Sequence, residues 1–351
     1  MDVGDGREQV LQLHDAVSAV RIGKEALVTS SWDGLVSVFR LQDGAPLTSI
    51  LGCAETDRCP VLDVALREDD ERWLYTACLD GSVNELNAEC DYQALEIKSS
   101  HGSRKLGAHT KGARNVAWLS GLVISTGWDG LVCGWDPRQN TSQGGAPVWQ
   151  HKLAEKCFAL SRPVVEDGND GARIAVACSD NCVYDIDVRG RTDQTVSRRS
   201  CLLTHQLRCV ELFGSSERTG FVAGSTEGRI AVHLPRSNTS SAEEAYAFRC
   251  HRRDTTIYPV NTLLMLREHS TFVSGGGDGS VCIWDALARK KIMQLATYDT
   301  SVSSLALSSC QTRFAVAVSY TFENGPVDHP PDRVILRSVD PRIFAPRSSK
   351  S

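Results

Sequence analysis

The stretch Ser274-Gly-Gly-Gly-Asp278-Gly-Ser-Val-Cys-Ile-Trp284-Asp285 contains the local pattern that decides the fold. Its Asp-Gly step is typical of a two-residue hairpin, because these residues tolerate the positive φ that such a turn requires. The flanking residues are apolar or β-branched, as half-buried strands require. The stretch therefore predicts the end of one strand, a tight turn and a second strand that closes with Trp-Asp.

The same acidic turn returns along the chain. Its acid occurs at six positions, with successive gaps of 47, 49, 51, 47 and 51 residues: Asp33, Asp80, Asp129, Asp180, Glu227 and Asp278. A repeat of about 40–45 residues with a Trp-Asp end is typical of a WD-repeat β-propeller, so each gap holds one blade and a modest loop. A seventh unit without the turn acid follows, with strands expected at Val302–Leu307, Phe314–Ser319 and Val334–Ser338.

We therefore predict an all-β fold, a seven-bladed WD-repeat β-propeller that forms a single domain over residues 1–345, with a disordered tail over residues 346–351. In blade three the strands are expected at Val116–Leu119, Leu122–Thr126, Leu131–Trp135 and Val148–Leu153. A strand near Val10–Leu13 should close the ring with the last blade, which hides the sheet edges. Polar or proline-rich composition predicts loops at Ser99–Gly107, Gln139–Ala146, Glu166–Gly171, Pro235–Ala245 and Thr321–Asp332.

The overall composition excludes several classes of protein. The chain has 38 Lys and Arg against 43 Asp and Glu, and a net charge of −5 argues against strong nucleic-acid binding. Its 13 cysteines are scattered singly, which favours a reducing compartment over a disulfide framework. The polar start is not that of a secretory signal, and no apolar run reaches the ~18 residues of a membrane span. There is no phosphate-binding glycine loop and no spaced set of metal ligands, so we expect no cofactor, no metal and no membrane partner.

Two sets of four polar residues recur at blade spacing: His109, Ser125, Asp129 and Trp135, and His251, Ser274, Asp278 and Trp284. In a propeller blade such side chains can satisfy one another away from water, as buried polar groups must. A His/Asp/Ser set also resembles a hydrolase triad. The structural interpretation is favoured because the set repeats and no Gly-x-Ser-x-Gly elbow is present. The sequence therefore does not predict an enzyme.

The residue just before each turn acid should lie on one rim of the propeller. These residues are Trp32, Leu79, Trp128, Ser179, Thr226 and Gly277. Two tryptophans on an exposed rim are unfavourable unless something covers them, and Trp is enriched in binding hot spots. Either a partner covers them or a neighbouring loop of the same chain does.

Positive charge is concentrated between Arg189 and Arg253. This segment has eleven Arg, no Lys and six acidic residues, a net charge of +5 that leaves −10 for the rest of the chain. Arginine clusters suit bidentate recognition of carboxylate or phosphate groups. The alternative is a solvated face without a partner.

Several longer stretches resemble the Bub/Rae family of WD-repeat mitotic checkpoint proteins. They are Ser30-Ser-Trp-Asp33, Gly127-Trp-Asp-Gly130, Trp135-Asp-Pro-Arg138, Gln206-Leu-Arg208, Glu227-Gly-Arg-Ile-Ala-Val232, Tyr246-Ala-Phe-Arg-Cys-His-Arg252 and Ile257-Tyr-Pro-Val-Asn261. The similarity runs from about residue 15 to 340 and is most specific over residues 206–285. The Tyr-Pro-Val-Asn stretch and Asp328-His-Pro-Pro-Asp332 fit the checkpoint branch better than the mRNA-export branch.

This resemblance implies a monomeric, non-enzymatic adaptor of the nucleus and kinetochore, with a cytoplasmic pool. It implies binding of a GLEBS motif in a Bub-family checkpoint kinase, or in its pseudokinase or Mad relative, through Trp32, Trp128 and Arg208. It also implies that Arg229 and Arg249 bind phosphothreonine in Met-Glu-Leu-Thr motifs of a phosphorylated kinetochore scaffold. Two alternatives remain open: a Rae-like export factor that binds a nucleoporin GLEBS motif, and a ubiquitin-ligase substrate receptor suggested by Trp135-Asp-Pro-Arg138. The segments 99–107 and 163–172 have no assigned role.

Overall fold

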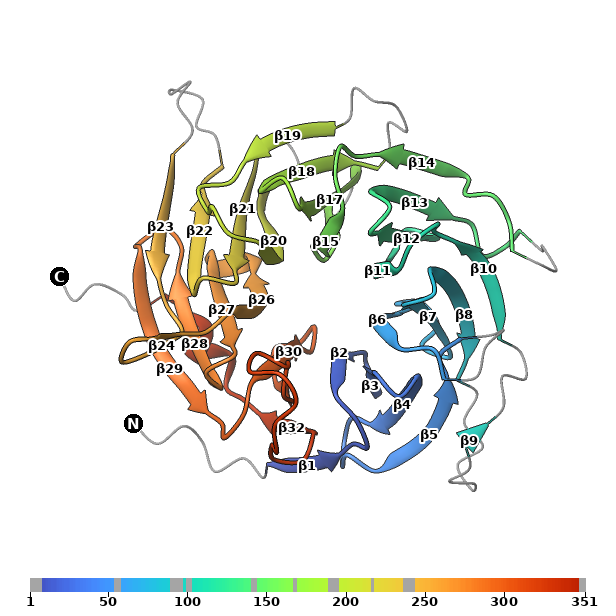
Figure 1. The fold of residues 1–351 in the computed structure, drawn as a ribbon, viewed down its shortest axis with the longest axis horizontal. Coiled ribbons are helices and arrows are strands. Elements are labelled where there is room, and N and C mark those ends of the chain that lie inside the picture. Colours follow the sequence, from blue (N-terminus) through green and yellow to red (C-terminus); the bar gives the residue numbers. More distant parts are fainter. Residues whose placement is uncertain are drawn as a thin grey trace.

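The computed structural model describes residues 8–53, 58–88, 97–98, 103–139, 144–166, 169–188, 196–215, 218–235 and 244–346. Seven antiparallel sheets stand around a central axis as the blades of a propeller (Figure 1). The predicted all-β, seven-bladed fold is therefore confirmed. Within the described residues, the helical elements are the 3-10 turns η2 (Arg267–His269) and η3 (Pro341–Phe344). None of the described helices is long and apolar enough to span a membrane.

Each of blades one to four has four strands that run from the axis outward. Blade one contains β2 (Val17–Ile22), β3 (Ala26–Ser31), β4 (Leu35–Arg40) and β5 (Pro46–Leu51). Blade two contains β6 (Val61–Leu66), β7 (Trp73–Cys78), β8 (Ser82–Asn87) and β10 (Arg104–Ala108). Blade three contains β11 (Ala113–Leu119), β12 (Leu122–Gly127), β13 (Leu131–Trp135) and β14 (Trp149–Lys152). Blade four contains β15 (Cys157–Leu160), β17 (Asn169–Cys178), β18 (Cys182–Asp187) and β19 (Val196–Ser200).

Blades five to seven follow the same plan. Blade five contains β20 (Leu207–Ser215), β21 (Arg218–Ser225), β22 (Arg229–His233) and β23 (Ala245–Arg249). Blade six contains β26 (Val260–Leu266), β27 (Thr271–Gly276), β28 (Ser280–Asp285) and β29 (Lys290–Thr297). Blade seven contains β30 (Val302–Leu307), β31 (Arg313–Val318), β32 (Arg333–Ser338) and β1 (Gln9–Gln12). The short strands are β9 (Ile97–Lys98) beside β5, β16 (Val164–Glu166) beside β17, and the hairpin of β24 (Arg252–Arg253) and β25 (Thr256–Ile257).

The first strand closes the ring. β1 pairs antiparallel with β32, with Gln9 opposite Leu336 and Gln12 opposite Arg333. Leu11 is buried in a cluster that joins blade seven to blade one. This pairing confirms the predicted closure and removes two open sheet edges.

The core lies between neighbouring blades. Val28 of blade one and Val64 and Leu74 of blade two belong to one cluster, and all three are fully buried. A middle strand such as β3 is buried along its whole length because a blade covers each of its faces. These strands therefore have continuous runs of small and apolar residues instead of a simple alternation.

Two predicted loops are wrong. Part of Ser99–Gly107 is β10, the outer strand of blade two, in which Arg104 lies 2.6 Å from the buried Glu85 carboxylate. In the predicted loop Glu166–Gly171, Glu166 ends β16 and residues 169–171 begin β17, in which Arg173 lies opposite Val164; residues 167 and 168 lie outside the described residues. The polar composition was misleading because ladder hydrogen bonds come from the backbone and an outer strand tolerates polar side chains.

The predicted loop Thr321–Asp332 contains no strand, as expected. The described parts of Gln139–Ala146 and Pro235–Ala245 contain no strand apart from Ala245, where β23 begins. Residues 99–102, 140–143, 236–243 and 347–351 of the predicted loops and tail lie outside the described residues.

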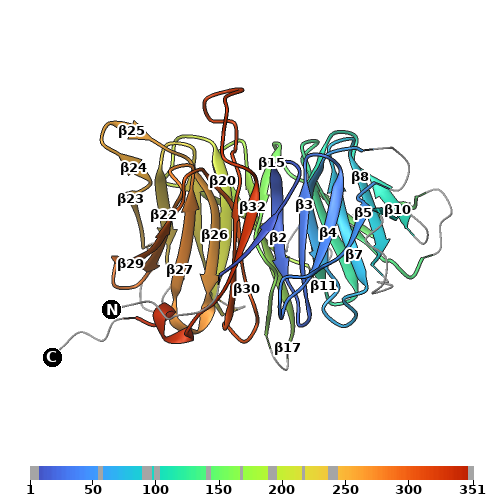
Figure 2. The ribbon, with the colours of Figure 1, turned by 90° about the horizontal axis from the view of Figure 1, so that it is seen from below.

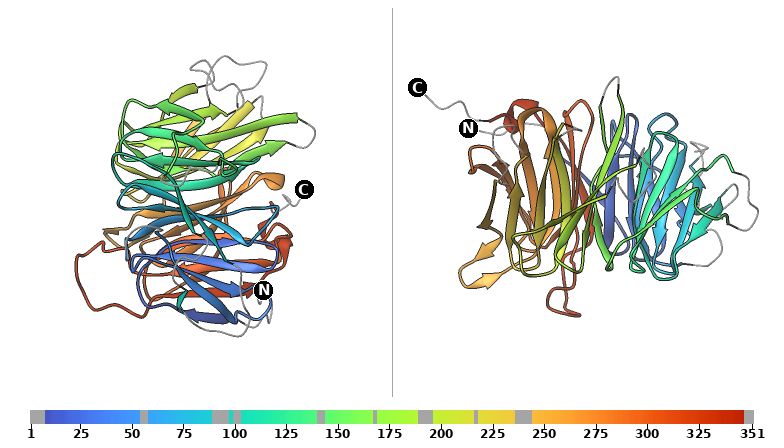
Figure 3. Two further views of the ribbon diagram at one scale, coloured as in Figure 1. Left: turned by 90° about the vertical axis from the view of Figure 1, so that its right-hand side faces the viewer. Right: turned by 90° about the horizontal axis from the view of Figure 1, so that it is seen from above.

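All inner strands begin at one face of the ring, which we call the upper face. The six turn acids lie at this face because each follows the second strand of its blade. Figure 2 shows the hairpin β24–β25 and the segment that leads into β32 projecting from it. The two further views in Figure 3 show the same projections on one side of the ring.

Candidate functional site

A backbone hydrogen bond recurs at the upper end of every blade. The N–H of the rim residue, or of Ser319 in blade seven, donates to the carbonyl of the residue immediately before the inner strand. The pairs are Trp32 with Ala16, Leu79 with Pro60, Trp128 with Gly112, Ser179 with Lys156, Thr226 with Gln206, Gly277 with Pro259 and Ser319 with Ser301, all at 2.9–3.0 Å. The rim residues therefore lie at equivalent positions around the upper face.

Just inside this rim, every inner strand has a bulge at its second residue. The pairing register skips one residue per blade: Ser18, Leu62, Arg114, Phe158, Arg208, Asn261 and Ser303. A bulge removes a residue from the ladder and redirects its side chain. We call these seven residues the bulge ring.

The bulge ring holds two half-buried arginines, Arg114 and Arg208. Burial lowers the pKa of the Arg208 guanidinium, whereas the fields of Cys209 and Glu323 oppose this shift. Burial also lowers the pKa of Arg114; Asp63 opposes that shift, and repulsion from Arg208 adds to it. Within the described residues, the guanidinium of Arg208 has no hydrogen bond or ion pair. Two cations that repel each other at the mouth of the channel suit a carboxylate ligand.

Arg208 was singled out from the sequence, but Arg114 was not. Its position could have shown it. Arg114 lies two residues after Gly112, just as Arg208 lies two residues after Gln206, and Gly112 and Gln206 each stand immediately before an inner strand. Aligning the repeats on the starts of the inner strands, as well as on the turn acids, would have placed both arginines in the same ring.

The rim is apolar over blades one to three. Trp32 exposes 46% of its surface, and Leu79 and Trp128 are half-buried. Trp128 lies against the backbone at Gly112, where an added Cβ would be 2.8 Å from its Cε3 atom. The structure thus places Trp32 and Trp128 two blades apart on one face, with Leu79 between them. Trp32 is the more accessible of the two.

Arg229 and Arg249 lie directly opposite each other in neighbouring strands. Their Cα atoms are register partners in the pair β22–β23, so their Cβ atoms are about 5 Å apart. Both belong to blade five, because β23 ends at Arg249 before the chain crosses to blade six. In the described part of the chain, neither guanidinium has a hydrogen bond or ion pair.

The hairpin β24–β25 adds a third cation beside this pair. Gly228 has a φ of +62°, and an added Cβ would lie 2.8 Å from the Tyr258 carbonyl oxygen, so only glycine lets the hairpin pack here. Arg252 donates from its Nη2 to the Glu227 carbonyl at 3.4 Å. Its guanidinium therefore lies near the turn that leads to Arg229.

The structure also brings together the two sets of four polar residues. In blade three, His109 Nδ1 is 3.0 Å from Asp129 Oδ1 and His109 Nε2 is 2.8 Å from Ser125 Oγ. Trp135 Nε1 donates to the same Ser125 Oγ at 2.8 Å. Burial lowers the pKa of His109 and outweighs the opposing effect of Asp129. Burial opposes ionisation of Asp129, but hydrogen bonds from backbone N–H groups and His109 lower its pKa.

Blade six repeats this arrangement. His251 lies 2.8 Å from Asp278 and 2.9 Å from Ser274, and Trp284 donates to Ser274 at 2.8 Å. Ser125 and Ser274 are fully buried, so neither hydroxyl can reach a substrate. The geometry is that of a closed polar network.

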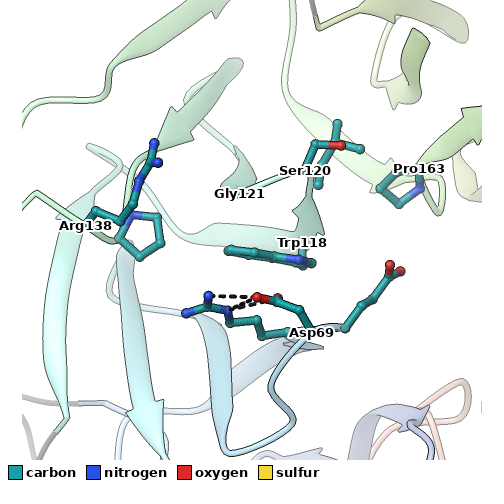
Figure 4. A pocket seen from close by; sticks show the side chains of 10 residues that line it. Asp69, Trp118, Ser120, Gly121, Arg138 and Pro163 are labelled. Carbon is teal, nitrogen blue, oxygen red and sulfur yellow. Dashed lines mark hydrogen bonds and ion pairs between the residues drawn. The ribbon is translucent and has the colours of Figure 1, made fainter. Parts of the chain in front are cut away.

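A separate pocket lies on the lower face, where the inner strands end. Its volume is about 410 Å³, and Figure 4 shows the Trp118 ring in it with Asp69, Arg138 and Pro163 around it. Arg138 lies 2.8 Å from Asp136, and Arg67 pairs with Asp69 at the same distance. The positive charges of this pocket are therefore already neutralised, unlike those of Arg208, Arg229 and Arg249.

Residues 243–285 match the family described as WD domain, G-beta repeat. The chain is 30% identical over 344 residues to "Mitotic checkpoint protein BUB3.1" of Arabidopsis thaliana, which covers 95% of this chain and 93% of that protein. It is 27% identical to "Protein Rae1" of Drosophila melanogaster, over 94% of each chain. The solved "Structure of U3-55K" has the same fold, with a TM-score of 0.69 at 14% identity and coverage of 95% of this chain and 98% of that one. Repeat pattern, closed propeller and full-length similarity lead to one conclusion: the chain belongs to the Bub3 family of WD-repeat mitotic checkpoint proteins.

Proposed function

We propose that this chain is a non-enzymatic kinetochore adaptor of the spindle assembly checkpoint. It binds a GLEBS motif of a Bub-family checkpoint kinase, or of its pseudokinase or Mad relative, across the upper face. The observation that carries this proposal is an apolar rim over blades one to three, from Trp32 to Trp128, together with the half-buried Arg208 of blade five on the same face. An extended peptide with apolar side chains and carboxylates would match both features.

Arg114 belongs to the same proposed site. Because Arg114 and Arg208 repel each other, a peptide carboxylate near both would relieve that repulsion on binding. We therefore assign Arg114 to the recognition of an acidic peptide residue, together with Arg208.

The second ligand of the adaptor is a phosphothreonine in a Met-Glu-Leu-Thr motif of a kinetochore scaffold, held by Arg229 and Arg249. The support for this part is the directly opposed pair of guanidinium groups in blade five. A phosphothreonine has about −1.5 to −2 charges and several strong acceptor oxygens, which two guanidinium groups can bind at once. The adaptor would then act in the nucleus and at the kinetochore, with a cytoplasmic pool.

A second candidate is an export factor that binds a nucleoporin GLEBS motif. It is favoured by the similarity to Protein Rae1 of Drosophila melanogaster over nearly the whole chain. The same rim would accept either GLEBS motif, so the two candidates differ in their partner and in RNA binding. A net charge of −5 gives little support to an RNA role.

Titration calorimetry with a checkpoint-kinase GLEBS peptide tests the proposal. Trp32→Ala should weaken binding by about 2 kcal/mol or more, the size typical of a hot spot, without changing the fold. Leu287→Ala is the matched control, because Leu287 is also an exposed apolar residue but follows β28 on the lower face. Equal affinity for wild type and Trp32→Ala would contradict the site. Tighter binding of a nucleoporin GLEBS peptide, together with salt-sensitive RNA binding, would favour the export factor.

A further inference from the structure

Blade two has cysteines where blades three and six have the histidine network. In those blades an added Cβ on Gly127 would lie 2.5 Å from His109 Nδ1, and one on Gly276 would lie 2.3 Å from His251 Nδ1. The imidazole therefore needs a glycine two residues before the turn acid. In blade two this position is Cys78, which precedes the turn acid Asp80 by two residues.

Blade two also has a cysteine at the position that the network histidine occupies in blade six. The N–H of Cys250 donates to the Gly228 carbonyl just before His251, and the N–H of Gly52 donates to the Gly34 carbonyl just before Cys53. Cys53 therefore corresponds to His251. A smaller side chain at this position leaves room for the Cys78 thiol, which a histidine would exclude.

These residues form a compact group of metal-binding atoms. The sulfur atoms of Cys53 and Cys78 and a carboxylate oxygen of Asp80 all lie within 4.8 Å of one another. Cys53 Sγ is 3.6 Å from Asp80 Oδ2.

We propose that Cys53, Cys78 and Asp80 form a binding site for Zn²⁺, with water as the fourth ligand. Thiolates and carboxylates are its usual ligands, and tetrahedral coordination with ~2.3 Å bonds places ligand atoms roughly 3.7 Å apart. The distance of 3.6 Å between Cys53 Sγ and Asp80 Oδ2 is close to this geometry before any cation is bound. Binding releases the two thiol protons to solvent as the sulfur atoms coordinate the cation.

The surroundings of the group fit a metal site. Asp80 Oδ1 accepts from the Ser82 N–H at 2.9 Å and from Ser82 Oγ at 2.7 Å, so its orientation is fixed by residues outside the ligand set. Asn84 Nδ2 donates to Cys78 Sγ at 3.5 Å, which is a typical partner for a coordinating thiolate. Asp80 is exposed, so the cation can enter from the upper face.

The role that follows is structural. Cys53 comes from the segment after blade one, whereas Cys78 and Asp80 belong to blade two. The cation would therefore link two blades at the place where His109 links blade two to blade three. The ligands come from two separate segments, which explains why no ligand spacing is visible in the sequence.

The test uses the full chain, kept reduced, stripped of metal with a chelator and titrated with Co²⁺. Wild type should bind one equivalent with the visible absorption of tetrahedral sulfur coordination, and Zn²⁺ should displace it and raise the melting temperature. Cys53→Ala/Cys78→Ala should not bind. The control Cys157→Ala/Cys178→Ala, which removes a buried pair of cysteines that lie opposite each other in blade four, should bind like wild type.

Asp80→Asn keeps the result interpretable if the double variant does not fold, because the Asp80 side chain is exposed. It should weaken Co²⁺ binding by more than roughly tenfold, since even an outer-sphere partner typically contributes that much. Absence of Co²⁺ uptake by the reduced wild type would overturn the proposal. So would uptake that is unchanged in Asp80→Asn, or a Cys53–Cys78 disulfide with no uptake after reduction.

Discussion

Blade three and blade five have the same four-stranded sheet but opposite arrangements of polar groups at their upper ends. In blade three, the side chains of His109, Ser125, Asp129 and Trp135 satisfy one another in a buried network. In blade five, the turn acid Glu227 meets the largely exposed His205 at 3.2 Å. Next to it, Arg229 and Arg249 face each other without a partner in the described chain.

This difference separates residues that stabilise the fold from residues that are available to a ligand. A closed buried network stabilises the folded state, because its members would be costly to bury alone. Two like charges directly opposite each other in a sheet destabilise it. An anionic ligand would reverse that effect in blade five, whereas the four side chains of the blade three network are already paired with one another.

The largest expected effect is the loss of phosphopeptide binding in blade five. Arg229→Ala or Arg249→Ala should each weaken binding of a Met-Glu-Leu-phosphothreonine peptide by about 10- to 100-fold, or about 1.4–2.8 kcal/mol. Binding of the unphosphorylated peptide should change little, and Lys at either position should restore binding only in part. Fluorescence anisotropy with both peptide forms measures these affinities.

The matched control for this experiment is Arg138→Ala, because Arg138 is an exposed arginine on the lower face that pairs with Asp136. It should leave phosphopeptide binding unchanged. If wild type binds both peptide forms equally, or if the Arg229 and Arg249 variants keep the preference for phosphate, blade five is not the phosphothreonine site.

The next effect is a loss of stability in blade three. Asp129→Ala should lower the free energy of unfolding by about 1–3 kcal/mol, because it leaves the buried His109 without its carboxylate. The same substitution of the turn acid in blade five, Glu227→Ala, should cost less than about 1 kcal/mol, since its partner His205 is largely exposed. Chemical denaturation of both variants measures the two losses in the free energy of unfolding. Equal losses would mean that the network of blade three has no special role in stability.

Lowering the pH should also reduce the stability of the protein through the polar network of blade three. The pKa of His109 in the folded state is below its ordinary value of 6.5, so the unfolded chain binds this proton more readily. The stability contributed by the neutral imidazole is present above pH 6.5 and is lost as the pH falls below 6.5 towards the folded-state pKa. The depressed pKa of Asp129 adds a further loss only below about pH 3.8.

Melting temperatures measured between about pH 8 and 5 test this effect of His109. His109→Gln should melt at a lower temperature than wild type at pH 8, but its melting temperature should fall less steeply as the solution is acidified. An identical slope for the two proteins would show that protonation of His109 does not limit stability in acid.

The fold could be predicted because its signal is repeated. Turn acids such as Asp33 and Asp278 recur at one-blade spacing, and each needs the same local chemistry. The outer strands carried less information: β10 looked like a loop, because solvent-facing strands tolerate Arg and Lys. Outer strands such as β10 and β23 were therefore the least certain parts of the prediction.

The candidate site was predicted only where a residue type was conspicuous. Trp32, Arg229 and Arg249 stood out by type and position, but their mutual geometry depends on strand register. Arg114 was missed because a bulge of one residue in each inner strand has no compositional signal. The cysteine group of blade two was missed because its members are distant in sequence and meet only when blades one and two pack together.

The smallest expected effect is a gain in stability in blade five. Arg249→Gln removes the like charge opposite Arg229 and keeps a long polar side chain on the exposed outer strand. Since directly opposed like charges typically cost about 0.2–1 kcal/mol, the variant should be more stable than wild type by that amount at low salt. At 1 M salt the Debye length is about 3 Å, so most of the gain should disappear. Arg138→Gln is the control, because Arg138 pairs with Asp136 on the lower face, away from these arginines, and it should show no gain. Chemical denaturation at both salt concentrations distinguishes the outcomes: a gain that persists at high salt would have another cause, and a loss at low salt would mean that the two arginines do not repel each other in the folded protein.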